Sequence, residues 1–140
     1  VIVGDVINAK EGEMPALVYI QPETAVKDAI DIMQGHSVSQ LPVAKGEMPL
    51  AAAEVQGSVS ELFLMERAFG GDDVLSKTVE EVMAPALPTI GVGEPIELAV
   101  KRLDQAPALM VLDGGRPRTV ISRTDVLSYL QAQDGLGGRR

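Results

Sequence analysis

Two side chains three residues apart, Ser122 and Asp125, are the best placed in this sequence to bind a ligand. The segment 120–125 joins an apolar run to a helical pattern, so Ser122 is positioned to cap the helix with its hydroxyl group. A helix N-terminus beside a hydroxyl group is a natural phosphate or carboxylate site, and an aspartate in the first turn can accept two ribose hydroxyl groups. The spacing of Ser122 and Asp125 therefore predicts a nucleotide-binding site. The alternative is a capping box in which aspartate replaces glutamate.

No catalytic set accompanies this pair. His36 is the sole histidine and lies in a polar turn, which excludes a histidine-rich metal site and argues against a Ser-His-Asp triad. The lack of cysteine excludes a thiol nucleophile, a cysteine-based zinc site and disulfides. No Walker A loop is present, and Gly91-x-Gly93 lacks the third glycine of a dinucleotide motif. We therefore predict that this chain is not an enzyme.

The composition excludes several partners. A formal net charge of -8 argues against a phosphate-backbone partner, which would need clustered lysine and arginine. No apolar run is long enough to span a bilayer, and no signal-peptide pattern opens the chain. We expect a cytoplasmic protein with neither a nucleic-acid nor a membrane partner. Hydrophobic residues make up 46% and aromatic residues 3%, so aliphatic side chains must build the core.

An internal repeat provides the elements that position these residues. One predicted helix carries apolar side chains at i, i+3, i+4 and i+7, and the same spacing recurs 70 residues later. The two sets are Val26, Ala29, Ile30 and Met33, and Ile96, Ala99, Val100 and Leu103. An internal repeat means two copies of one supersecondary unit, and a pair of similar units has a cleft between them.

Each copy is predicted to be β-α-β-β-α, with a short helix in front, which gives an α/β (α+β) fold. For the first copy we predict a helix over 3–9, a loop over 12–15, a strand over 17–20, a helix capped by Thr24 and ending near 35, strands over 40–44 and 51–59, and a helix over 60–69. For the second we predict a helix opened by a Thr78 capping box, a strand over 87–90, a helix with Pro95 in its first turn, a strand over 109–112, a hairpin turn over 113–115, a strand over 118–122 and a helix over 123–131.

The copies are predicted to span residues 1–69 and 76–133, with a linker over 70–75 and a flexible tail over 134–140. They are not chemically equivalent. Ser60 aligns with Ser122, but Phe63 stands where the second copy has Asp125. Only the second copy therefore has a carboxylate that could accept ribose hydroxyl groups.

The two copies, each with hydrophobic-x-Ser-x-x-Asp or its remnant before the last helix, resemble a tandem of CBS domains (a Bateman module) over residues 3–131. The segments Val38-Ser39-Gln40-Leu41-Pro42-Val43 and Pro22-x-Thr24-Ala25-Val26-x-x-Ala29-Ile30 strengthen the resemblance. The segments 38–43, 57–61 and 108–111 are also similar to the C-terminal regulatory region of bacterial cystathionine β-synthase-like proteins. In such proteins a pyridoxal-phosphate catalytic domain precedes the module, and a start at Val1 rather than Met fits a fragment.

The resemblance implies two repeats packed by pseudo-two-fold symmetry around a site for an adenosyl ligand: S-adenosylmethionine, AMP, ADP or ATP. The acidic charge favours S-adenosylmethionine or AMP over ATP. The residues implied by motif match are Leu17, Val18, Val38, Gln40 and Leu41 from the first copy, and Val120, Ser122, Thr124 and Asp125 from the second. The opposite site, with Ser60, Phe63, Leu87, Ala108 and Leu109, is expected to be empty or blocked.

The resemblance further implies a non-catalytic regulatory module that forms a homodimer through its helices. Its ligand would shift the population of conformations and so control or stabilise an attached enzyme that carries the pyridoxal phosphate. The alternative is a module that only dimerises or docks and has lost its ligand.

Overall fold

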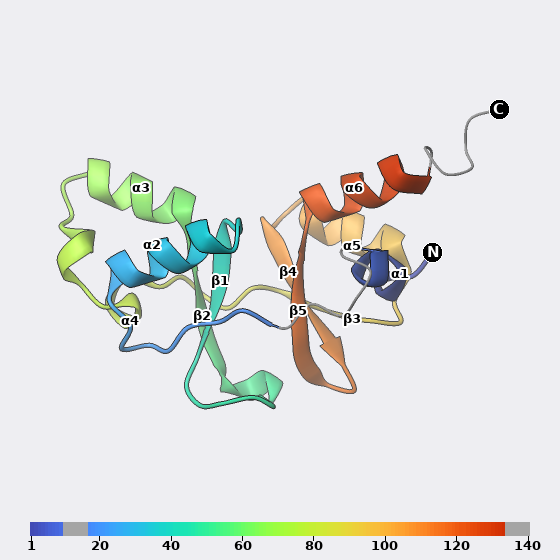
Figure 1. The fold of residues 1–140 in the computed structure, drawn as a ribbon, viewed down its shortest axis with the longest axis horizontal. Helices are drawn as coiled ribbons and strands as arrows, with labels where there is room; N and C mark the ends of the chain where they lie inside the picture. Colours follow the sequence, from blue (N-terminus) through green and yellow to red (C-terminus); the bar gives the residue numbers. More distant parts are fainter. Residues whose placement is uncertain (10–16, 134–140) are drawn as a thin grey trace. The chain divides into compact units, whose positions relative to one another are not determined.

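The computed structural model describes residues 1–9 and 17–133, which form a mixed α+β fold with two compact units (Figure 1). The central unit comprises Val18–Leu87. The terminal unit comprises the described residues of Val1–Leu17 and Pro88–Arg140, so the two ends of the chain belong to one unit.

The terminal unit is built on a three-stranded sheet in the order β3-β4-β5. β3 (Thr89–Gly91) is parallel to β4 (Ala108–Asp113), and β4 is antiparallel to β5 (Arg116–Ser122). The predicted hairpin turn is confirmed, because Gly114 and Gly115 both have positive φ and join β4 to β5, as a type I′ turn requires. α5 (Ile96–Leu103) connects β3 to β4, and α6 (Arg123–Gln133) follows β5.

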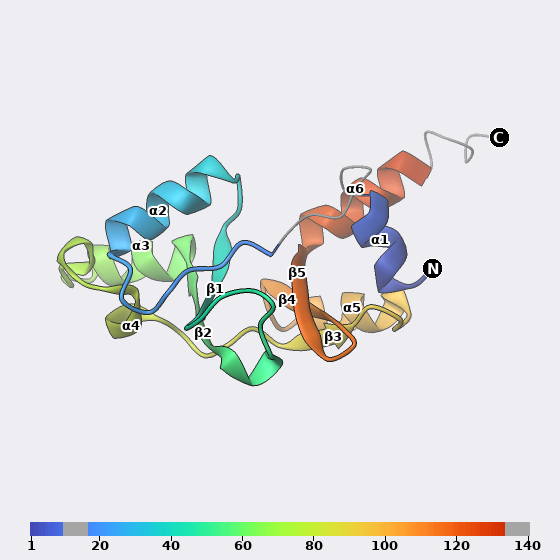
Figure 2. The same cartoon turned by 60° about the horizontal axis from the view of Figure 1, so that its bottom comes forward.

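The first helix of the chain, α1 (Val3–Ala9), completes the core of the terminal unit. Val3 and Ile7 are fully buried and pack with Ile90 and Leu109 in one apolar cluster. The backbone N–H of Val3 also donates to the carbonyl of Glu94 at 2.9 Å. Figure 2 shows α1 beside α6, with which it is in contact. An element from the start of the sequence therefore packs with strands that lie eighty residues or more later.

The central unit is built on the antiparallel pair β1 (Gln40–Ala44) and β2 (Val55–Ser60). Single bridges extend this pair on both sides, parallel at Ile20 to Val43 and antiparallel at Ala84 to Ser58. α2 (Val26–Gly35) precedes β1, and α3 (Glu61–Phe69) follows β2. The predicted β-α-β-β-α order is thus present, with its first strand reduced to a bridge.

The short helix α4 (Val79–Val82) completes the core of the central unit. Val79 and Val82 are fully buried in the cluster that contains Val26 and Met33. The backbone N–H of Val79 donates to the carbonyl of Thr24 at 2.8 Å. The capping box predicted for this helix is present, because the Glu81 carboxylate accepts from the backbone N–H and the hydroxyl group of Thr78.

The compact units therefore differ from the predicted copies at 1–69 and 76–133. Each short leading helix packs into the unit formed by the other copy's strands, so α1 belongs with residues 88–133 and α4 with residues 18–87. The segment 70–75 includes the start of a 3-10 turn, Val74–Ser76, and Val74 is buried in the central core. Sequence periodicity assigns each helix to the copy in which it lies along the chain. Burial instead brings together the apolar surfaces that become shielded from water, wherever they lie in the sequence.

Four local predictions need correction. The strand predicted over 87–90 is β3, which begins at Thr89 and ends at Gly91. Thr24 does not cap α2, because Ala25 holds the N-cap position and no side chain caps that helix. The strand predicted over 51–59 begins at Val55, since Ala52–Glu54 form a 3-10 turn. Pro95 precedes its helix as the N-cap. The predicted loop at 12–15 and the tail at 134–140 lie outside the described residues. Among the described helices, none combines the length and apolarity needed to cross a membrane.

Candidate functional site

Ser122 and Asp125 meet at the junction of β5 and α6 in the terminal unit. Ser122 is the last residue of β5, and Asp125 lies in the first turn of α6. The backbone N–H of Ser122 donates to Oδ2 of Asp125 at 2.8 Å, and the Ser122 hydroxyl group donates to the same oxygen at 3.2 Å. Both residues are half-buried. One half of the capping box that the sequence left open as an alternative is therefore present, the hydrogen bond from the Ser122 backbone to the Asp125 carboxylate, and it holds that carboxylate at the helix N-terminus.

The matching junction in the central unit has a different chemistry. The Ser60 hydroxyl group accepts a hydrogen bond from the backbone N–H of Phe63 at 3.1 Å and caps α3. Where the terminal unit has a carboxylate, this unit has the half-buried ring of Phe63. The guanidinium of Arg67 lies over that ring, 5.5 Å from its centroid. An aromatic ring covered by a cation offers no acceptor for ribose hydroxyl groups.

An ion-pair cluster fixes the arginine in this position. Asp72 accepts from Lys77 Nζ at 2.6 Å and from Arg67 Nε at 2.8 Å. The Lys77 hydrogen bond, followed by that of Arg67, holds the pKa of the Asp72 carboxyl group below its ordinary value. The cluster ties the end of α3 to the segment before α4, so the Phe63–Arg67 contact has a support outside its own helix.

The predicted first-copy residues gather mainly at the start of β1. Gln40 lies opposite Ser60 in the β1–β2 register, and Leu41 lies opposite Val59. Val38 is half-buried against the central core. Leu41 has only 1% of its surface exposed and belongs to that core, so only its main chain remains for a ligand.

The other predicted residues are divided between the units. Leu17 groups with the terminal unit, whereas its neighbour Val18 groups with the central unit. Val120 lies in β5 opposite Met110, and Thr124 is exposed in the first turn of α6. The terminal unit thus places the residues from 120 to 125 at one strand–helix junction. The combined site that draws on both units stays a prediction.

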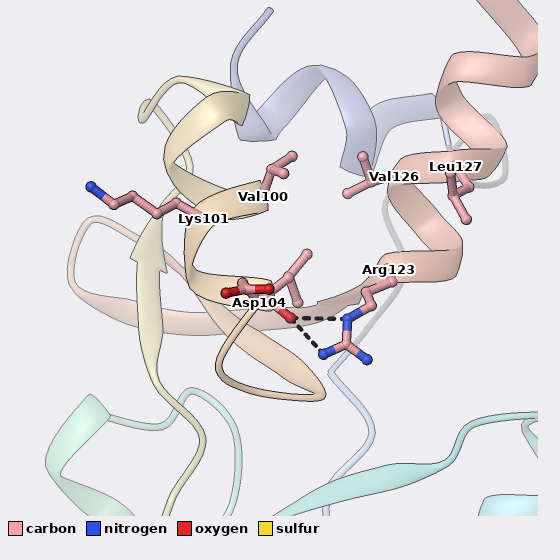
Figure 3. Close-up of a pocket in the computed structure, with 7 residues that line it drawn as sticks. Val100, Lys101, Asp104, Arg123, Val126 and Leu127 are labelled. Carbon is pink, nitrogen blue, oxygen red and sulfur yellow. Dashed lines mark hydrogen bonds between the residues drawn. The ribbon is translucent and has the colours of Figure 1, made fainter.

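Two hollows between helices were not predicted from the sequence. In the terminal unit a hollow of about 550 Å³ lies between α5 and α6. Figure 3 shows Val100 on α5 facing Val126 and Leu127 on α6 across it. Arg123 closes one end, since its Nη2 donates to the carbonyl of Leu103 at 2.7 Å, at the C-terminus of α5. In the central unit a hollow of about 350 Å³ lies between α2 and α3.

One feature of the sequence gives a weak indication of the terminal hollow. Apolar residues of α6 extend around the helix instead of following one stripe, so Leu127 and Leu130 stay exposed while Val126 is buried. Excess apolar residues on a helix indicate a second packing face. Within residues 1–9 and 17–133, no group of three or more His, Asp or Glu side chains is arranged to hold a metal ion.

Comparison with solved structures shows a shared fold. A putative signal-transduction protein with CBS domains from Burkholderia ambifaria is 21% identical, with 94% of this chain and 95% of that chain covered and a TM-score of 0.79. A CBS-domain containing protein from Agrobacterium tumefaciens is 17% identical, with 92% of each chain covered and a TM-score of 0.75. The CBS domain of a bacterial CNNM/CorC family Mg²⁺ transporter in complex with ATP is 17% identical, with 93% and 87% covered and a TM-score of 0.69.

Comparison with protein-family models identifies the repeated unit. The CBS domain model matches residues 3–50 and again residues 79–132. The two matched stretches correspond to the two predicted copies, each with its leading helix, and together they cover more than half of the chain. The chain therefore belongs to the CBS domain family and carries two copies of the domain.

Proposed function

We propose that this CBS-domain pair is a non-catalytic regulatory module that binds one adenosyl ligand, S-adenosylmethionine, AMP or ATP. In this proposal the repeats pack by pseudo-two-fold symmetry around the ligand. The residues that would contact it are Leu17, Val18, Val38, Gln40, the main chain of Leu41, Val120, Ser122, Thr124 and Asp125. Binding would favour one arrangement of the repeats and so control or stabilise an attached enzyme, proposed to be a pyridoxal-phosphate-dependent cystathionine β-synthase-like domain.

The observation that carries the proposal is the β5–α6 junction. There a carboxylate, a hydroxyl group and an exposed threonine surround the first turn of one helix. The two hydrogen bonds from Ser122 orient the Asp125 carboxylate before any ligand arrives, which lowers the entropy lost on binding. A solved CBS domain of the same fold was determined in complex with ATP, which supports an adenosyl ligand for this pair.

The difference between the two units supports a single site. The Phe63 ring under the Arg67 guanidinium takes the place of the second carboxylate. The opposite site, which would draw on Leu87, Ala108 and Leu109, is therefore proposed to be empty or blocked. One ligand per chain is the expected stoichiometry.

A second candidate function is a module that only pairs with another protein and binds no ligand. It is favoured by the engagement of Asp125 in its own helix cap. It is also favoured by exposed apolar side chains on helices of both units, including Phe69 and Leu127. Under either candidate we propose that the chain forms a homodimer.

Calorimetric titration with AMP and with S-adenosylmethionine tests the ligand proposal. We expect binding at one site per chain and a loss of affinity of about tenfold or more in Asp125→Asn, because that carboxylate would accept ribose hydroxyl groups. Glu81→Gln is the matched control, since Glu81 fills the same capping position in α4 and lies outside the proposed site. It should keep the wild-type affinity.

The outcomes separate the candidates. If neither AMP, ATP nor S-adenosylmethionine binds up to millimolar concentration, the ligand proposal is wrong and the docking function stands. The proposed attached enzyme is tested separately, by determining the sequence that is encoded before Val1. A pyridoxal-phosphate fold there supports it, and any other domain contradicts that part alone.

A further inference from the structure

Arg123 joins the start of α6 to the end of α5. Its Nε and Nη2 both donate to the carbonyl of Leu103, at 2.9 Å and 2.7 Å (Figure 3). Nη2 also donates to the carbonyl of Ala106 at 3.5 Å. Leu103 is the last residue of α5, and the last four carbonyls of a helix have no partner within that helix. The Arg123 guanidinium therefore supplies donors and a positive charge where a helix end favours both.

The place of Arg123 on α6 gives this contact a consequence for the proposed ligand site. Arg123 and Val126 are three residues apart, so they lie on the same face of the helix. Val126 is buried in the terminal core. Ser122 and Asp125 have the same spacing one residue earlier, which places them about 100° around the helix axis. Two anchors on one face thus fix the direction in which the neighbouring face points.

The sheet closes this arrangement. Ser122 lies opposite Ala108 in the β4–β5 register. Residues 104–107 connect the helix end that Arg123 binds to the strand that pairs with Ser122. The first turn of α6 is therefore connected to the end of α5 twice, through the β4–β5 pairing and through the Arg123 hydrogen bonds.

The central unit has no such donor at the aligned position. Glu61 follows Ser60 there, as Arg123 follows Ser122 in the terminal unit. An ionised carboxylate accepts hydrogen bonds only, so it cannot bind the carbonyls at the end of α2. The arginine therefore occurs in the unit that has the Asp125 carboxylate and is replaced in the unit that has the Phe63 ring.

We propose that Arg123 is a positioning residue for the adenosyl site. It holds the first turn of α6 against the end of α5 and so keeps the Asp125 carboxylate in the direction that would accept ribose hydroxyl groups. The inference rests on the proposed function. Because coupling between two sites is reciprocal, a ligand bound at Asp125 would in turn strengthen the contact of α6 with α5.

Calorimetric titration with AMP tests this role. Arg123→Met removes the guanidinium and keeps an unbranched apolar side chain. We expect it to weaken AMP binding by about threefold or more, because the carboxylate is no longer held in one direction before binding. Arg123→Lys should recover part of the loss, since an ammonium group can still donate to a carbonyl of α5.

Arg102→Met is the matched control. Arg102 lies in the same unit, and its Nη1 donates to the backbone carbonyl of Thr89 at 2.6 Å, away from the β5–α6 junction. This variant loses a hydrogen bond of the same kind and should keep the wild-type affinity. Circular dichroism checks that each variant folds.

A double-mutant cycle identifies the route of the effect. In the Asp125→Asn background, Arg123→Met should weaken AMP binding little further, because the carboxylate through which it acts is already removed. An arginine that affected the ligand by another route would give two losses of affinity that add.

Amide hydrogen exchange provides a measurement that needs no ligand. Arg123→Met should speed exchange over the first turns of α6 by about fivefold or more, whereas Arg102→Met should leave it unchanged.

Wild-type affinity in Arg123→Met overturns the proposal, and so does full additivity in the cycle. If the wild-type chain binds no adenosyl compound, the proposed function fails and hydrogen exchange decides the role of Arg123. Unchanged exchange in α6 of Arg123→Met then overturns the positioning role, and faster exchange in that variant alone supports it.

Discussion

At the scale of single residues, Asp125 serves two purposes in the proposed module. Its carboxylate holds the start of α6 through Ser122 and is also the group proposed to accept ribose hydroxyl groups. Loss of such a cap costs about 0.5–2 kcal/mol of stability. Affinity and stability must therefore be measured on the same variant, with the equivalent cap at Glu81 as the reference.

Gly57 in β2 is a position where any side chain meets backbone. A Cβ atom added there would lie 2.6 Å from the carbonyl oxygen of Ala84 and 2.8 Å from the sulfur of Met83. Gly57→Ala is expected to lower the free energy of unfolding by about 1–3 kcal/mol in urea denaturation. Gly35→Ala is the control, because its Cβ meets nothing within 4 Å outside its own helix backbone, and it should be neutral or stabilising. Equal stability of the two variants would contradict the close approach at Gly57.

The Asp72 cluster predicts a dependence of stability on pH. Hydrogen bonds from Lys77 and Arg67 lower the pKa of the Asp72 carboxyl group in the folded chain. Its stabilisation is therefore complete above the unfolded pKa and is lost as pH falls through the folded pKa. Asp72→Asn should be less stable than wild type at neutral pH, and the difference should shrink below about pH 4. A constant difference across the acid range, measured by thermal denaturation, would argue against the cluster.

At the scale of elements, the exchange of leading helices is the main result. α1 and α4 each carry buried valines or isoleucine that their own copy's strands do not cover. A helix as short as α4 gains little from its own hydrogen bonds, so packing decides where it lies. The exchange makes each compact unit depend on residues from both predicted copies.

Two core variants test this exchange. Ile7→Ala in α1 should cost about 2–5 kcal/mol and speed amide hydrogen exchange in β4 and β5. Val82→Ala in α4 should speed exchange in β1 and β2 instead. Each side chain is fully buried, in the terminal and central cores respectively. Faster exchange in β1 and β2 of the Ile7 variant, with β4 and β5 unchanged, would contradict the assignment of α1.

At the scale of the whole molecule, the acidic charge is concentrated in residues 18–87. A negative field raises the free energy of any bound polyphosphate and is screened by salt. The negative charge is therefore expected to affect both which ligand binds and how two copies of the chain associate.

The charge predicts an order of affinities among adenosyl ligands. AMP is expected to bind more tightly than ATP at low ionic strength, because ATP brings more negative charge to an acidic protein. The ratio of the two affinities should fall as salt is raised, since screening weakens that repulsion. Calorimetry at low and high salt checks this, with adenosine as the uncharged reference. Tighter binding of ATP at low salt would show that local basic groups outweigh the field.

Much of the fold could be predicted from the sequence, because local rules act over a few residues. The helical spacing at Val26 to Met33 and the paired glycines at 114–115 each determine their structure within one turn or hairpin. The prediction that Thr24 caps α2 is wrong because the N-cap position falls one residue later, at Ala25. The Thr24 carbonyl instead accepts from the backbone N–H of Val79 in α4, a contact that local rules do not predict.

The sequence by itself determined the two copies, their order of elements, and the contrast between Asp125 and Phe63. Only the tertiary structure decided which leading helix completes which core, that Asp125 is held by Ser122, and that Arg67 covers the Phe63 ring. Periodicity and motif spacing are properties of neighbouring residues. Burial and side-chain contacts join residues far apart in the chain, and they form because excluding water from apolar faces is favourable wherever those faces lie in the sequence.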